Sequence, residues 1–140
     1  MSDVSVNFKR KALTDKIIRG FYNVYNTLGH GFLERCYEQA MLMELEHLGL
    51  QATAQVPLEV FYKSKSIGQF YADIIVENKV ILELKAVSQL TKEHSAQLLN
   101  YIRATQIEVG LLLNFGAEVQ IVRKALDNAL KKSIHTRLSS

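Results

Sequence analysis

The chain has 140 residues, of which 48% are hydrophobic and 22% are charged. These fractions are typical of one soluble globular domain and exclude a disordered or coiled-coil protein. Lys and Arg total 17 against 14 Asp and Glu, and the net charge of +3 fits a nucleic-acid partner and an ordinary soluble protein equally well.

A single cysteine, Cys36, excludes an intrachain disulfide and a multi-cysteine zinc site, and it fits the reducing cytoplasm. The sequence carries no export signal at its N-terminus and no apolar run as long as a membrane span. We therefore expect one cytoplasmic domain over residues 1–140 with no membrane partner. Its core covers about residues 14–123, and a basic, polar segment follows at 124–140.

Helical spacing of apolar residues predicts two helices in the first third of the chain. The first covers residues 14–28, with Thr14 as its N-cap, and ends where Gly29 interrupts the pattern. The second covers residues 33–48 and ends at Gly49.

The period of the apolar residues then changes to that of strands. Residues 56–62 alternate, residues 67–76 form a second extended run, and residues 80–87 are β-branched and apolar, as in the centre of a sheet. Helical spacing returns at residues 91–105. The remaining expected elements are a buried strand, a short edge strand and a C-terminal helix, at residues 109–115, 119–122 and 125–130. This order predicts an α+β domain whose mixed sheet is flanked by helices.

Charged residues interrupt the most apolar predicted strand. Glu83 and Lys85 lie inside it, and the strand period of two puts both side chains on one face. A third charge, Asp73, lies in the preceding strand. Burying a charge costs several kcal/mol unless the charge is paired or bound to a metal. The charged residues on this face of the strand therefore indicate either ion pairs or a bound metal.

The length of the loop between these two strands decides whether the carboxylates meet. If residues 77–79 form a three-residue hairpin loop, Val76 pairs with Val80 and Asp73 lies opposite Glu83. A two-residue loop would shift the register and put the two carboxylates on different faces of the sheet.

Two like charges directly opposite each other repel unless a divalent cation or a proton neutralises them. Mg²⁺ is the natural candidate, because it takes one or two carboxylates and leaves room for waters and phosphate oxygens. Lys85 beside the ion would orient a water or stabilise developing negative charge. The alternative is a salt-bridge network of Asp73, Glu83 and Lys85 on a solvent-facing side of the sheet.

This arrangement resembles the PD-(D/E)XK nuclease superfamily, in which an Asp at the end of one strand is followed by Glu-x-Lys in the next. Here the motif residues are Asp73 and Glu83-Leu84-Lys85. More narrowly, the chain is similar to the small GxxExxR proteins over about residues 14–123. The blocks that carry this similarity are Gly31-Phe-Leu-Glu34, Tyr71-Ala-Asp73, Glu83-Leu-Lys85-Ala-Val, His94-Ser-Ala-Gln97-Leu-Leu-Asn-Tyr101 and Gly110-Leu-Leu-Leu-Asn-Phe-Gly116.

The resemblance implies a restriction-endonuclease-like core, with three antiparallel strands followed by a crossover helix and a further strand. It implies that Asp73 and Glu83, with the backbone carbonyl of Leu84, ligate Mg²⁺ or Mn²⁺. Lys85 would position the attacking water. Glu34 would correspond to the acidic residue that some members of the superfamily add to the metal site.

The resemblance also reaches the third predicted helix. Gln97 and Tyr101 match a Gln-x-x-x-Tyr element that borders the active site and contacts the nucleic-acid strand. His94 projects from the same side of this helix and is a further candidate for lining the site. Two positions depart from the family pattern: Ala72 replaces the Pro of the superfamily motif, and Tyr37 stands where the GxxExxR label has Arg.

The sequence therefore predicts a divalent-metal-dependent nuclease that acts on DNA rather than RNA. The alternative is an inactive nuclease-fold module that binds nucleic acid or a partner protein, because a fold does not establish catalysis. The sequence leaves open whether two chains pair as a homodimer.

Overall fold

A computed structural model of the chain describes residues 9–131 and 135–138. In chain order the elements are α2 (Lys11–Leu28), α3 (Glu34–His47), β1 (Ala52–Tyr62), β2 (Lys65–Val76), β3 (Val80–Lys85), α4 (Lys92–Arg103), β4 (Val109–Phe115), β5 (Val119–Ala125), the 3-10 turn η1 (Asn128–Leu130) and β6 (His135–Leu138).

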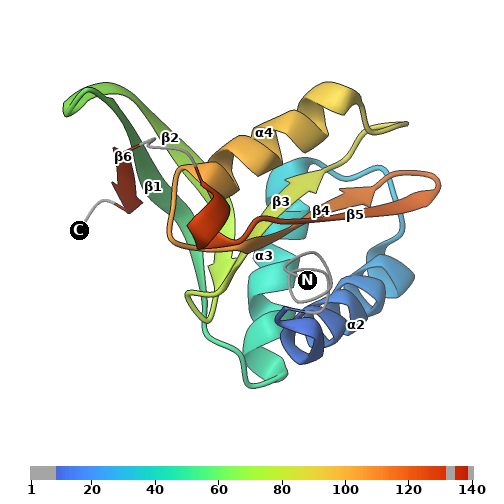
Figure 1. Cartoon of the computed structure of the whole chain (residues 1–140). Coiled ribbons are helices and arrows are strands. Elements are labelled where there is room, and N and C mark those ends of the chain that lie inside the picture. The colour runs from blue at the N-terminus through green and yellow to red at the C-terminus, as the bar shows by residue number, and fades with distance from the viewer. Residues whose placement is uncertain (1–8, 132–134, 139–140) are drawn as a thin grey trace.

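The strands form one six-stranded mixed sheet in the order β5-β4-β3-β2-β1-β6 (Figure 1). Strands β3 and β4 pair in parallel across the connection through α4, and the other neighbouring strands described are antiparallel. The strand that carries the Glu-x-Lys motif lies inside the sheet, as predicted. This is the α+β, restriction-endonuclease-like architecture that the sequence predicts.

Helices cover both faces of the sheet, and the two faces of β3 show why its sequence is so apolar. Leu82 and Leu84 belong to the core cluster that α2 and α3 cover. Ile81 belongs to the cluster beneath α4, with Leu98 and Ile102 of that helix. Because side chains alternate along a strand, Glu83 shares the α4 side of the sheet with Ile81.

The first helix begins one turn earlier than predicted. Thr14 is not its N-cap: the side chain is buried within the helix, and its hydroxyl donates to the carbonyl of Lys11 at 3.1 Å. Leu13 also packs against the core, so the apolar stripe extends beyond the predicted start. The predicted end is confirmed, because Gly29 has a φ of 68° and caps the helix.

The C-terminal part of the chain differs from the prediction. The helix predicted over residues 125–130 is wrong: β5 runs through Ala125, paired with Val109 of β4, and only η1 follows. The sequence also did not predict β6, which pairs with β1. Within the described ranges, none of the helices combines the length and the apolar character needed to cross a membrane.

The hairpin between β2 and β3 has a three-residue loop, one of the two lengths that the sequence left open. Val76 lies opposite Val80, and both Glu77 and Asn78 adopt left-handed backbone conformations, with φ of 54° and 56°. This confirms the register on which the meeting of the two carboxylates depends.

Candidate active site

Asp73 and Glu83 lie opposite each other on β2 and β3, and each carboxylate accepts a hydrogen bond from a backbone N–H of the other strand. Oε2 of Glu83 accepts from the backbone N–H of Asp73 at 3.0 Å, and Oδ2 of Asp73 accepts from the N–H of Leu84 at 2.8 Å. The regular ladder between these strands ends at the pair Ile74 and Leu82. Beyond this pair, the backbone N–H groups donate to carboxylate oxygens instead of backbone carbonyls. These bonds fix the orientation of both carboxylates.

Burial gives Glu83 unusual electrostatics. Its side chain is in the core, with the residue only 4% exposed. Burial first, and the charge of Asp73 second, raise the pKa of Glu83 to about 8, against the opposing effects of the Asp73 N–H and of Lys85. In the protein without metal, Glu83 therefore carries a proton at neutral pH.

Asp73 shares this environment. Burial raises its pKa, whereas the hydrogen bond from Leu84, the charge of Lys85 and a hydrogen bond from Gln55 lower it. Lys85 acts on both acids through its charge, yet none of the ion pairs within 4.0 Å among the described residues involves the three motif residues. The alternative of a solvent-facing salt-bridge network is therefore wrong, because Glu83 is buried and Lys85 forms no direct pair.

An irregularity in β1 places a residue that the sequence analysis missed, Gln55, near the carboxylates. Its φ of 53° is costly for a residue other than glycine, and the ladder of β1 with β2 has no pair at this residue, between the pairs Ala54–Ile74 and Val56–Ala72. Its amide donates to Oε1 of Glu38 at 2.8 Å and also hydrogen-bonds Asp73. Gln55 precedes the alternating run that predicted the strand, so no signal marked it.

Glu34 lies at the rim of the carboxylate pair. It is the exposed first residue of α3, and its charge is one of the causes that raise the pKa of Glu83. Over residues 9–131 and 135–138, no group of three or more His, Cys, Asp or Glu side chains is arranged to hold a metal ion. The structure thus brings Asp73 and Glu83 together and leaves Glu34 within electrostatic reach of them.

Tyr37 holds the start of α3 in place. Its buried ring stacks on Phe115 with the ring centroids 4.1 Å apart, and its hydroxyl donates to the carbonyl of Gly29 at 2.6 Å. The same hydroxyl accepts from the N–H of Phe32 at 3.2 Å. Where the GxxExxR label has Arg, this chain therefore has a core residue that fixes the loop before Glu34.

The three candidates on α4 have different surroundings. The side chain of Gln97 donates to the hydroxyl of Tyr101 at 3.2 Å. Burial, and then the charges of Glu83 and Asp73, raise the pKa of Tyr101, so this ring lies near both acids. His94 instead caps its own helix: its Nδ1 accepts from the N–H of Thr91 at 3.1 Å.

A sequence model of the PD-(D/E)XK nuclease superfamily matches residues 11–125 of the chain. The chain belongs to this superfamily. Comparison with curated proteins and with solved structures gave no significant match. PD-(D/E)XK nucleases generally use divalent metals, which agrees with a pair of opposed carboxylates in the sheet.

In the PD-(D/E)XK motif of this chain, Ala72 takes the place of Pro. It is fully buried in the core cluster beneath α4 and lies opposite Val56 in the β1–β2 ladder. The replacement is next to Asp73 and changes none of the oxygen atoms that the motif offers to a metal.

The segment after the PD-(D/E)XK lysine is anchored by a second residue that the sequence analysis missed. Asn114, fully buried in β4, accepts from the N–H of Val87 at 3.0 Å and donates to its carbonyl at 2.9 Å. Gln120 of β5 accepts from Asn114 and from the N–H of Leu90. A polar residue inside the apolar run 109–115 was the available signal, of the same kind that drew attention to Glu83.

Proposed function

We propose that this protein is a divalent-metal-dependent nuclease that hydrolyses phosphodiester bonds of DNA and belongs to the GxxExxR group. The observation that carries the proposal is the buried pair of opposed carboxylates, Asp73 and Glu83, each oriented by a backbone N–H, with Lys85 following on the same strand. The donor set of two carboxylates and the Leu84 carbonyl contains only oxygen, which suits Mg²⁺ or Mn²⁺.

Each motif residue has a defined task in this proposal. Asp73 and Glu83, with the backbone carbonyl of Leu84, would hold the ion, and Glu34 would contribute a further carboxylate. When bound, the ion supplies Lewis-acid activation of the phosphate and a water of lowered pKa. To serve as a ligand, Glu83 would give up its proton to solvent water, and Lys85 would orient the attacking water and balance the negative charge that develops on the phosphate.

The residues of α4 would guide the strand. Tyr101 and Gln97 line the approach to the carboxylate pair and contact the nucleic acid, whereas the contact of His94 is restricted by its role as a helix cap. If the substrate that is cut is a duplex, the proposal includes a homodimer in which two chains hold it.

The test is a cleavage assay with labelled single- and double-stranded DNA and RNA in Mg²⁺, Mn²⁺ or EDTA. Wild type is compared with Asp73→Ala and Lys85→Ala, and with Glu46→Gln, which changes an exposed carboxylate of α3. We expect metal-dependent cutting by wild type and Glu46→Gln, and a loss of at least about 100-fold in the other two variants.

Cutting that persists in EDTA or in both site variants would contradict the proposal. If all four proteins are inactive but bind nucleic acid or a partner protein, the chain is instead a binding module with a nuclease fold. Gel-shift measurements on the same oligonucleotides detect the nucleic-acid case.

A further inference from the structure

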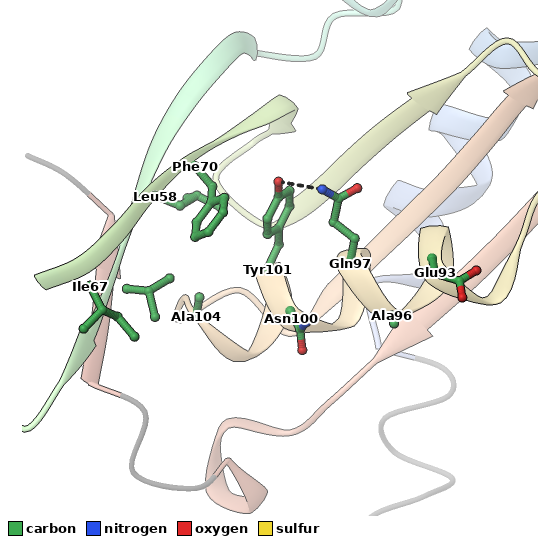
Figure 2. A pocket seen from close by; sticks show the side chains of 10 residues that line it. Leu58, Ile67, Phe70, Glu93, Ala96, Gln97, Asn100, Tyr101 and Ala104 are labelled. Carbon is green, nitrogen blue, oxygen red and sulfur yellow. Dashed lines mark hydrogen bonds between the residues drawn. The ribbon is translucent and has the colours of Figure 1, made fainter.

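A groove of about 510 Å³ lies between α4 and the β1–β2 hairpin (Figure 2). Leu58, Ile67 and Phe70 lie on its hairpin side, and α4 forms its other wall. Its volume falls in the range of small-ligand sites, roughly 300–1,000 Å³. Phe70 and Ile67 are 45% and 65% exposed, so large apolar side chains of the groove are in contact with solvent.

Tyr101 and strand β2 relate the groove to the carboxylate pair. The ring of Tyr101 lines the groove, and its centroid is 6.1 Å from that of Phe70, with the two planes tilted by 42°. Its hydroxyl accepts from Gln97, and the charges of Glu83 and Asp73 act on it. Phe70 of the groove lies three residues before Asp73 on β2, so a strand held at the carboxylates can extend into the groove.

The chemistry of the lining limits what fits there. No Lys or Arg of the described chain lines the groove, so it does not suit a phosphate. Apolar and aromatic walls suit a flat uncharged ring, and the amides of Gln97 and Asn100 offer donors and acceptors to the edge of such a ring. A nucleobase has this combination of apolar faces and polar edges.

We propose that the groove binds one unpaired nucleobase of the strand whose phosphate is held at Asp73 and Glu83, with the base stacked against Phe70. This inference rests on the proposed nuclease function and narrows its substrates to strands that offer an unpaired base at the point of cleavage. Single strands and frayed ends meet this condition. A base within a duplex has to leave its stack, which costs a few kcal/mol.

The test uses single-stranded DNA in which one abasic residue is moved stepwise along the sequence. Wild type is compared with Phe70→Ala, with Phe70→Leu as a variant that keeps an apolar side chain, and with Tyr62→Ala. Tyr62 is the matched control, because it is an aromatic residue of the same hairpin, 61% exposed, and does not line the groove.

Wild type and Tyr62→Ala should cut about 10-fold more slowly when the abasic residue reaches one particular position, because stacking of one base contributes about 1–3 kcal/mol. Phe70→Ala should cut the intact strand about 10-fold more slowly and lose nothing further at that position. Phe70→Leu should fall between them. Equal rates of wild type at all abasic positions, or an additive loss in Phe70→Ala, would overturn the proposal.

Binding measured by fluorescence anisotropy in EDTA separates this inference from the nuclease proposal. Wild type that cuts no substrate can still support the base site. It does so if it binds the intact strand more tightly than the strand with the abasic residue at one particular position, and if Phe70→Ala loses this difference in affinity. Equal binding in all combinations overturns it. Equal cutting of duplex and single strands overturns it while keeping the nuclease. A changed oligomeric state of Phe70→Ala with unchanged cutting would assign the groove to a protein contact.

Discussion

The protonation of Glu83 links the candidate site to the stability of the fold. Its pKa is raised from 4.5 to about 8, chiefly by burial. Between these two pH values the folded protein keeps a proton that the unfolded chain releases. The free energy of unfolding of the metal-free protein therefore falls as the pH rises from about 4.5 to about 8.

Glu83→Gln removes this titration and keeps a carbonyl oxygen that can accept from the N–H of Asp73. In EDTA we expect this variant to be more stable than wild type by at least about 1 kcal/mol at pH 8, and nearly equal to it at pH 5. Urea unfolding at both pH values measures the difference. Glu46→Gln, at an exposed helical position, should show no such pH dependence. A gain that is equal at both pH values would contradict the explanation.

At the scale of a single element, Gln55 of β1 connects α3 to the candidate site. Gln55 in its left-handed conformation reaches both Glu38 and Asp73. Such backbone conformations cost about 1–3 kcal/mol and occur mostly where the surrounding structure enforces them. We interpret Gln55 as a positioning residue that orients Asp73.

Two substitutions separate the effect of the Gln55 backbone conformation from the effect of its amide. Gln55→Ala and Gln55→Gly both remove the amide, and both should raise the Mg²⁺ concentration for half-maximal cleavage by about 10-fold. Gln55→Gly should be the more stable of the two by roughly 0.5–1 kcal/mol, because glycine adopts positive φ without strain. Metal titrations of cleavage and thermal unfolding check the two effects, with Gln69→Ala as an exposed control on β2. An unchanged metal requirement would leave Gln55 with a structural role alone.

Helices and strands whose apolar residues recur with an unbroken period were predictable. The three-residue loop that places Asp73 opposite Glu83 was one of two alternatives that the sequence left open, and the structure decides between them. The parts that failed depend on contacts between distant segments. The left-handed conformation of Gln55 occurs between two residues, Ala54 and Val56, that pair with β2. The extension of β5 through Ala125 depends on pairing with β4. The side chain of His94 caps its own helix, so it is not free to line the site. The spacing of residues along the helix does not distinguish these two roles.

For the whole molecule, metal binding should appear as a change in global stability. The two carboxylates come from adjacent strands of one sheet, and helices pack on both of its faces. A ligand that binds only the folded state stabilises it by about 1.4 kcal/mol at ten times its dissociation constant. Such a gain raises the melting temperature of a domain of this size by a few degrees.

We therefore expect Mg²⁺ to raise the melting temperature of wild type by about 2–6 °C relative to EDTA. Asp73→Asn should lose the increase, because it removes a ligand charge and keeps an oxygen that can accept from Leu84. Circular dichroism melts in MgCl₂, with KCl at matched ionic strength, measure it. The same increase in Asp73→Asn would place Mg²⁺ elsewhere on the protein.

The anchoring of the segment after Lys85 by Asn114 and Gln120 also sets an order of events during synthesis. The ribosome synthesises the motif residues before Asn114 and Gln120, and before the strand that pairs in parallel with β3. A nascent chain that ends before Asn114 therefore carries all three motif residues but lacks both side chains that hold the segment after Lys85. We expect the candidate site to form only after β4 and β5 have been synthesised.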